Sequence, residues 1–337
     1  MKEAPRRMQR GVNTACWLSP QGTENLLGEI QGCLDDRTCE KYSMIDIISN
    51  VKCELGEGLI WDPTLNLLLM TDITKNRLIT IDVYHDTYCE WDMPELIGWV
   101  LLTERKSTYA LGLKSGIAFL DTTSQLELAW VNREFPDHPQ CRLNDACTDA
   151  LGRIWYGSMN YCDSTKEDGE LASISCELHP KVHDSGFTVT NGPLISPDSK
   201  YLLLNDTLKG IVYQYDFSLT LGELSNRRVF MTFQPDQGFP DGMCFDVEGN
   251  LWLAMWGVGK VLKVSRQGEI LHEYNIPAPN VTNVCFGGIN LDRLFISSAT
   301  AGLEESNASM FLQSGSVFEL KNHGTRGFNS HLVKLER

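Results

Sequence analysis

One sequence unit recurs along the chain from residue 45 onward. Each copy contains a turn built on Asp, Pro or Gly, an apolar strand, a polar break and a second strand that ends near an acidic residue. The copies begin at Trp61, Glu104, Thr148, Ile195, Phe245 and Phe286. Successive copies lie roughly 40–50 residues apart, which is a period typical of β-propeller blades. The repeat predicts an all-β fold, and no long helical period competes with it.

The repeat also predicts how its copies pack. A four-stranded antiparallel meander cannot bury both of its faces alone, whereas blades packed radially cover those faces and leave only short edges. Six copies therefore predict a six-bladed β-propeller over residues 45–337. The loops at one end of such a ring converge on its central channel, so we expect a binding site at that mouth.

Residues 1–44 differ from the rest of the chain. They carry six basic and six acidic residues and lack strand alternation. The stretch TENLLGEIQGCL has leucines and an isoleucine near helical spacing, which favours one short amphipathic helix. We therefore predict an N-terminal extension that is loosely ordered or forms this helix.

The overall composition narrows the classes of partner. The formal net charge is −15, which disfavours binding to nucleic acid or to an anionic membrane surface. The 11 cysteines form no CxxC pair and most lie in apolar stretches, which favours reduced thiols. No signal-peptide pattern and no apolar run of about 18 residues occurs, so we expect a cytoplasmic protein that does not span a membrane. The oligomeric state stays open between monomer and dimer.

Four strand starts are more polar than a buried strand requires. No GxSxG, HExxH or phosphate-binding loop is present, so any catalysis must use oxygen and amide groups. The unusual polar groups are Glu57 in CELGEGLIWD, Arg142, Asn144 and Asp145 in CRLNDACTDALG, Asn191 in VTNGPLISPD and Asp241 in FPDGMCFDVEG. One such residue beside Gly is usually a turn residue. Because all four stretches precede their turn-and-strand unit, we expect them to meet at one channel mouth.

Several longer stretches resemble one known family. They are LGEGLIWD, RLNDACTDALGRIWYGSM, NGPLISPDSKYLLLND and the segment from SNRRVF to WGVGKVLKV, followed by CFGG at 285–288 and TAGL at 300–303. In this order they resemble the gluconolactonases and senescence marker protein 30, also called regucalcin, from about residue 45 to 320. The resemblance implies a six-bladed propeller that carries one divalent metal ion on its axis and hydrolyses sugar lactones.

The resemblance implies a metal centre with three protein ligands. The metal-binding residues of the family fall on Glu57, Asn191 and Asp241. Three oxygen ligands, two of them charged, suit Ca²⁺, Mg²⁺ or Mn²⁺, with Zn²⁺ as an alternative. We expect the metal to polarise the lactone carbonyl and Asp241 to activate the attacking water as general base, or mainly to orient it.

The resemblance also implies which residues contact the substrate. The residues that hold the sugar hydroxyls and the lactone fall on Arg142 and Asn144. A substrate-contacting glutamate of animal members is replaced here by Cys162, and this difference leaves the preferred sugar open. Asp145 is expected to orient Arg142 or to cap a turn.

Two other functions remain open at this point. The propeller is alternatively a calcium-binding or regulatory protein with weak or vestigial lactonase activity, although pure metal binding does not need Arg142 and Asn144. It is alternatively a propeller esterase that acts on a non-sugar lactone or another ester. Met255 and Trp256, near the Asp241 strand, would supply apolar surface for such a substrate.

Overall fold

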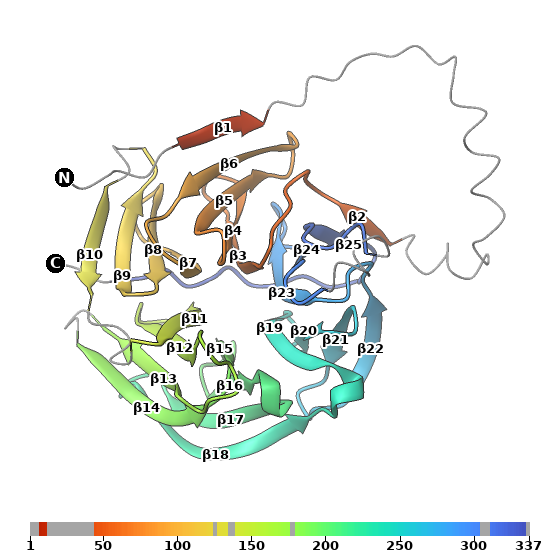
Figure 1. Cartoon of the computed structure of the whole chain (residues 1–337). Helices are drawn as coiled ribbons and strands as arrows, with labels where there is room; N and C mark the ends of the chain where they lie inside the picture. Colours follow the sequence, from red (N-terminus) through yellow and green to blue (C-terminus); the bar gives the residue numbers. More distant parts are fainter. Residues whose placement is uncertain are drawn as a thin grey trace, which may run out of the picture.

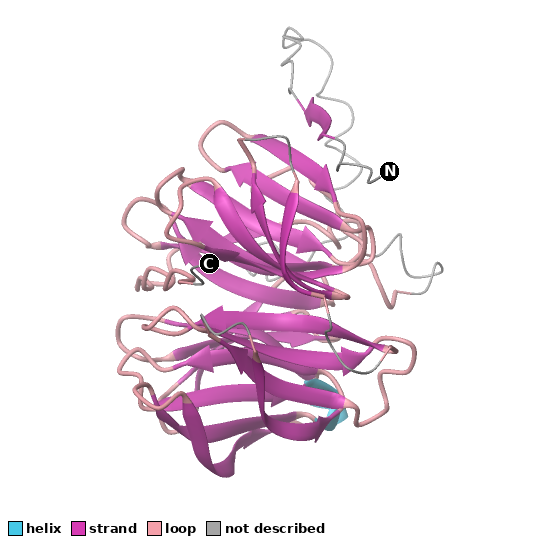
Figure 2. Cartoon of the chain, turned by 90° about the vertical axis from the view of Figure 1, so that its left-hand side faces the viewer, coloured by secondary structure: helices cyan, strands magenta, loops and turns pink. Residues whose placement is uncertain are grey.

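The computed structural model describes residues 7–11, 44–123, 127–133, 139–175, 179–303 and 311–334. In this part of the chain the regular structure is almost entirely β-strand, arranged as six antiparallel sheets around a central opening (Figure 1). The loops gather at the two ends of the ring (Figure 2). The prediction of an all-β, six-bladed propeller is confirmed.

The first three blades follow one another around the ring in sequence order. Blade 1 contains β3 (Gly56–Asp62), β4 (Leu67–Asp72), β5 (Arg77–Asp82) and β6 (Thr87–Asp92). Blade 2 contains β7 (Ile97–Leu102), β8 (Thr108–Leu113), β9 (Gly116–Asp121) and β10 (Leu128–Asn132). Blade 3 contains β11 (Cys141–Thr148), β12 (Ile154–Asn160), β13 (Gly169–Ile174) and β14 (Pro180–Phe187).

The remaining three blades complete the ring. Blade 4 contains β15 (Thr190–Ile195), β16 (Tyr201–Asp206), β17 (Ile211–Ser218) and β18 (Glu223–Thr232). Blade 5 contains β19 (Phe239–Phe245), β20 (Leu251–Trp256), β21 (Lys260–Val264) and β22 (Ile270–Asn275). Blade 6 contains β23 (Val281–Gly287), β24 (Arg293–Ser298), β25 (Phe318–Leu320) and β2 (Ile45–Ile47).

Blade 6 is built from both ends of the propeller sequence. Its strand order is β2-β25-β24-β23, so β2, which precedes blade 1, forms the outer edge of the last blade. Ile45 lies opposite Leu320, and Ile47 lies opposite Phe318. This pairing closes the ring with backbone hydrogen bonds rather than with side-chain packing alone.

Little of the predicted N-terminal extension lies within the described residues. Residues Arg7–Gly11 form β1, which pairs antiparallel with β6 and extends blade 1 to five strands. Strand alternation does not predict β1, because pairing with an exposed edge needs no apolar face. The short helix predicted around residues 23–34 lies outside the described residues.

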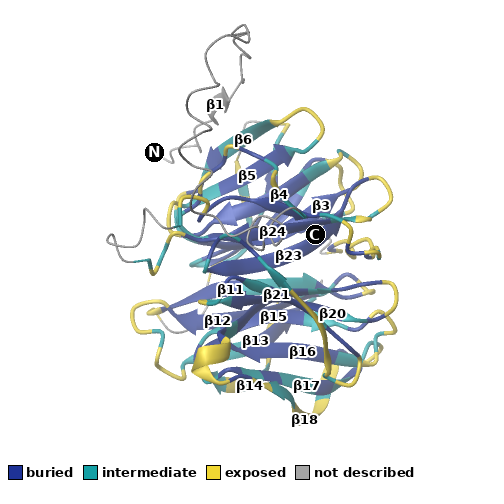
Figure 3. Ribbon diagram, turned by 90° about the vertical axis from the view of Figure 1, so that its right-hand side faces the viewer, coloured by how far each residue is buried: buried dark blue, intermediate teal, exposed yellow. Residues whose placement is uncertain are grey.

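Burial falls from the channel outward within a blade. All seven residues of β3 are buried, whereas most residues of β18 are exposed (Figure 3). A first strand that is covered on both faces reads as a continuous apolar run, as in LIW of β3. The described residues include two short 3-10 helices, η1 (Thr207–Lys209) and η2 (Pro235–Gln237), and contain no helix long and apolar enough to cross a membrane.

The turn after the first strand of a blade explains the recurring sequence unit. Asp246 Oδ1 accepts the backbone N–H groups of Glu248 and Asn250, and Asp246 Oδ2 accepts the indole N–H of Trp252 at 3.1 Å. Asp149 bonds to Trp155 in the same way, at 2.9 Å. The unit seen in the sequence therefore begins at the turn between the first two strands, and each blade starts one strand earlier.

This turn makes a testable contribution to stability. Asp246 is fully buried, and Asp246→Ala leaves the indole N–H of Trp252 and two backbone N–H groups without their acceptor. We expect the free energy of unfolding to fall by about 2–4 kcal/mol in urea titrations. Asp198→Ala, at an exposed turn position of blade 4, should change it by less than about 0.5 kcal/mol. Equal effects of the two changes would contradict this reading.

The C-terminal segment 326–334 crosses one end of the channel (Figure 1). At one side the N–H of Gly327 donates to the carbonyl of Leu291, in blade 6. At the other side the N–H of Val333 donates to the carbonyl of Leu102, in blade 2. Leu291 lies in the turn after β23 and Leu102 ends β7, so both anchors are at the ends of first strands, and this segment covers the end of the channel opposite the starts of the first strands.

Candidate metal centre

Five of the predicted site residues lie near the starts of first strands. Glu57 is on β3, Arg142 and Asn144 are on β11, Asn191 is on β15 and Asp241 is on β19. The first strands face the channel and start at the same end of the ring, so these side chains converge although blades 1, 3, 4 and 5 supply them. The strand pairing of each first strand is also irregular at this point, for example between Glu57 and Ile60. Such bulges redirect side chains toward a site.

The Glu57 carboxylate is buried beside other charged groups. Its side chain is 8% exposed and accepts hydrogen bonds from the backbone N–H of Gly58 and from the side chain of Asn283. Burial, and after it the charge of Asp145, raise the pKa of Glu57 to about 8 against the opposing effects of Arg142 and of the two hydrogen bonds. Burial disfavours the charged form, so a cation at this carboxylate would be favourable.

The Asp241 carboxylate has one oxygen without a protein partner. Asp241 is 3% exposed, and its carboxylate accepts the backbone N–H of Gly242, whereas Oδ1 has no hydrogen-bond partner in the described part of the chain. Burial and the charges of Glu57 and Asp145 raise the pKa of Asp241 well above its ordinary value. A bound ion or water would give this buried oxygen the partner that it lacks.

A chain of hydrogen bonds fixes the two asparagines. Asn144 Nδ2 donates to the carbonyl of Thr190 at 2.6 Å and to Asn191 Oδ1 at 2.8 Å. Asn191 Nδ2 donates to Thr207 Oγ1 at 2.9 Å, and that hydroxyl donates to the carbonyl of Pro240. The amide oxygen of Asn191 therefore keeps a lone pair for a cation, and Asn144 has only its oxygen left for a ligand.

Arg142 and Asp145 add one positive and one negative group. Burial lowers the pKa of Arg142 to about 10, although Glu57 and Asp241 favour its charged form. Its Nη1 donates to the carbonyl of Leu143 at 3.0 Å. Burial raises the pKa of Asp145 to about 7.

Asp145 has a structural role that differs from orienting Arg142. Its Oδ1 accepts the N–H of Ala146, and its Oδ2 accepts the N–H of Gly192 at 2.9 Å. These bonds tie blade 3 to blade 4 next to Asn191, so the alternative expectation of a backbone-capping role describes its contacts better.

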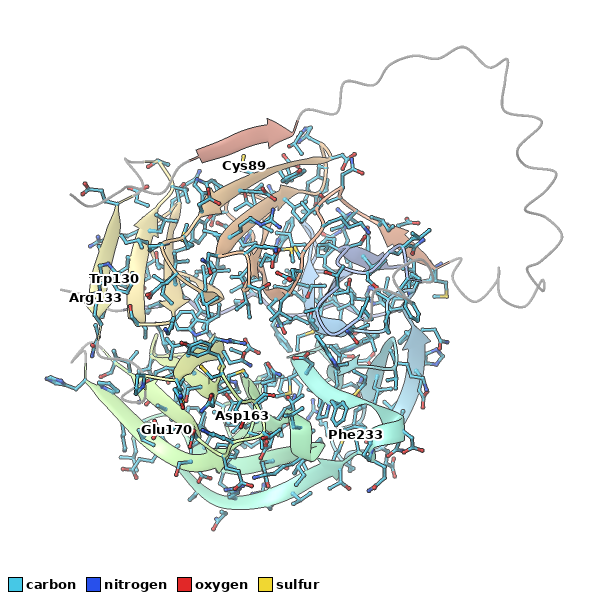
Figure 4. The ribbon with its side chains drawn as sticks, viewed as in Figure 1. Cys89, Trp130, Arg133, Asp163, Glu170 and Phe233 are labelled. Atoms are coloured by element: carbon cyan, nitrogen blue, oxygen red, sulfur yellow. The ribbon has the colours of Figure 1, made fainter. Side chains whose placement is uncertain are left out.

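Cys162 lies at the same end of the ring but outside this group. It follows β12 and is exposed, and its backbone N–H donates to Asn160 Oδ1. The next residue, Asp163, is labelled in Figure 4 and lies inside the circle of outer strands marked by Cys89 and Trp130. The structure therefore places Cys162 at the rim, where a substrate role stays a prediction.

Two asparagines that support the site were missed by the sequence reasoning. Asn283 on β23 bonds to Glu57, and Asn205 on β16 donates from Nδ2 to the backbone carbonyl of Asp241. Both occur inside apolar strands without an adjacent glycine, in VTNVCF and YLLLND. A search for polar residues at the same offset in every first strand would have found Asn283.

A cavity of about 540 Å³ lies on the inner side of this group. It is lined by the first strands of all six blades and by residues 328–331 of the C-terminal segment. Its lining includes Gly58, Gly192 and Asn283, which adjoin or support the candidate ligands, and then continues along apolar positions of each strand. The cavity thus extends from the candidate centre toward the C-terminal segment that covers the other end of the channel.

The donor set fits a divalent cation. It combines the carboxylates of Glu57 and Asp241, with the partnerless Oδ1 of Asp241, and the amide oxygen of Asn191. Oxygen donors with two charges suit a hard divalent ion. The raised pKa values of both carboxylates follow from burial and like charge, and both causes are relieved by a cation.

Comparison with known proteins identifies the family of the chain. The family described as SMP-30/Gluconolactonase/LRE-like region matches residues 55–300, a span that contains every first strand from β3 to β23. The chain belongs to this family. Membership in the SMP-30/gluconolactonase family supports a lactonase-type or calcium-binding propeller function.

Individual relatives cover most of the chain. Among curated proteins, an uncharacterized protein of Sulfolobus acidocaldarius is 33% identical over 260 residues, which are 75% of this chain and 90% of that protein. Regucalcin of Danio rerio is 28% identical and covers 84% of this chain and 96% of its own length. Among solved structures, a luciferin-regenerating enzyme is 30% identical with a TM-score of 0.81, and the match covers 86% of this chain and 99% of that one.

Proposed function

We propose that this propeller is a divalent-metal-dependent hydrolase that opens a sugar lactone, such as glucono-1,5-lactone, to the corresponding acid. The observation that carries the proposal is the partnerless, buried Oδ1 of Asp241 beside Glu57, Asn191 and a buried Arg142. A cation would give this oxygen a partner and would offset the burial of two carboxylates near one guanidinium. Membership in the family supports the reaction class.

Glu57, Asn191 and Asp241 would hold the cation through their side-chain oxygens. When bound, Ca²⁺, Mg²⁺, Mn²⁺ or Zn²⁺ polarises the lactone carbonyl and stabilises the negative charge that develops on its oxygen. Asn144 Nδ2 donates both of its hydrogens, to Thr190 and Asn191, so the side chain would accept a hydrogen bond from a sugar hydroxyl through Oδ1. Arg142 would donate to substrate oxygens through its remaining N–H groups.

Asp241 is the proposed general base. It would take a proton from the attacking water as the water oxygen bonds to the carbonyl carbon, and return it to the ring oxygen when the ring C–O bond breaks. The backbone around it is rigid, because its carbonyl accepts from Asn205 and its carboxylate accepts from Gly242. The bond from Gly242 fixes the orientation of the carboxylate, so that Oδ1 would meet the cation and the other oxygen would take the proton through its remaining lone pair.

The proposal is tested by assaying a panel of aldonolactones against a panel of divalent cations after chelation. Hydrolysis is expected to fall at least about tenfold on chelation and to return with one or more of the cations. Hydrolysis that is unaffected by chelation would contradict the proposal. Cation binding without turnover of any lactone would favour the second candidate, a calcium-binding propeller, which the similarity to regucalcin supports.

A further inference from the structure

Asn283 lies on β23, between the blades that carry Asp241 and Glu57. It is 6% exposed, and its Oδ1 accepts the N–H of Val284 at 2.8 Å. Because Oδ1 accepts a backbone N–H of its own strand, Nδ2 is the atom of the amide that can donate hydrogen bonds to other residues. The side chain of Asn283 also forms a hydrogen bond with the Glu57 carboxylate, and Nδ2 is the group that can donate it.

The Asn283 side chain also packs against the strand of Asp241. A Cβ atom at Gly242 would lie 2.4 Å from Asn283 Cγ and 2.5 Å from its Nδ2, so only glycine fits there. The neighbouring residue Thr282 donates to the carbonyl of Gly56, immediately before Glu57. The amide of Asn283 therefore lies between Gly242, which follows Asp241, and the carboxylate of Glu57.

The same relation recurs at the other two candidate ligands. In each case an asparagine of the preceding blade donates to the ligand residue: Asn283 to Glu57, Asn144 to the side chain of Asn191, and Asn205 to the backbone of Asp241. We propose that Asn283 is a positioning residue that holds the Glu57 carboxylate toward the channel axis. This inference rests on the proposed metal-dependent function.

The test measures cation affinity rather than activity. The full-length chain is stripped with chelator and titrated calorimetrically with CaCl₂ and with MnCl₂. Asn283→Leu has nearly the same volume but no donor, and we expect its Kd to rise about 10–100-fold, the cost typical of losing a residue that orients a metal ligand. Asn283→Ala removes the donor without adding bulk and should show the same rise.

Asn280→Leu is the matched control. Asn280 is a buried asparagine just before β23, and its Nδ2 donates to the carbonyl of Ala301 rather than to Glu57. It should lower the thermal unfolding midpoint of the cation-free protein but leave Kd within about twofold of wild type. An unchanged Kd in both Asn283 variants, or an equal rise in Asn280→Leu, would overturn the inference and leave the proposed function standing. A wild-type protein that binds neither cation would overturn both.

Discussion

Asp241→Asn is expected to reduce lactone turnover by about a thousandfold or more while the protein stays folded. The amide keeps the shape of the side chain but cannot take a proton from water and offers a cation no charge. General-base catalysis alone contributes roughly 10²–10⁴-fold, and loss of a charged ligand adds to that. The measurement is kcat for glucono-1,5-lactone with saturating cation, together with far-UV circular dichroism.

The control for this change is Asp236→Asn, in η2 three residues before β19. Asp236 is exposed, so its substitution alters the local charge without touching the channel. Its turnover should stay within about twofold of wild type. Undiminished turnover in Asp241→Asn would remove Asp241 from the chemistry and with it the proposed mechanism.

Glu57→Gln is expected to stabilise the cation-free protein while weakening its cation binding. Burial raises the pKa of Glu57 to about 8 from 4.5, so the folded state keeps a proton that the unfolded state has released. Wild-type stability should therefore fall as the pH rises from about 4.5 to about 8, by about 1.4 kcal/mol for each unit of the pKa difference. Glutamine does not ionise, so the free energy of unfolding of the variant should not fall in this way as the pH rises.

The measurement is urea unfolding of chelated protein at several pH values. At pH 8 the variant should be more stable than wild type by about 4 kcal/mol, and the difference should nearly disappear at pH 4.5. Its Kd for Ca²⁺ or Mn²⁺ should rise at least about 100-fold. Glu54→Gln, on an exposed carboxylate nearby, should show neither effect. A Glu57→Gln profile that parallels wild type would show that Glu57 is not held in an unfavourable environment.

The blade number was predictable because it depends on local sequence. The Asp246 and Asp149 turns satisfy N–H groups of their own loops and anchor the following tryptophan, so they leave the same sequence pattern in blades 5 and 3. The strand at which each blade begins was harder to predict, because in the sequence the first strand is a separate apolar run that precedes the turn. Strands β1 and β2 depend on partners far away in sequence, and no local pattern identifies such partners.

The candidate site was predictable only in part. The polar residues beside glycine, such as Glu57 and Asp241, stand out because a charged side chain in a buried strand is unfavourable unless it binds something. Asn205 and Asn283 read as ordinary members of apolar strands, and their hydrogen bonds depend on the neighbouring blade. The direction in which Asn144 and Asn191 present their amide oxygens follows from contacts that span blades 3, 4 and 5, so sequence alone could not give it.

The pairing of β2 with β25 has a consequence for how this protein is made. The outer strand of blade 6 emerges early from the ribosome, but its partner follows only after almost the whole chain has been synthesised. Until then blades 1 to 5 would form an open arc that exposes one uncovered sheet face at each end, and such apolar surfaces promote association with other chains. A chain that stops before Phe318 is therefore expected to be an aggregation-prone arc rather than a smaller ring.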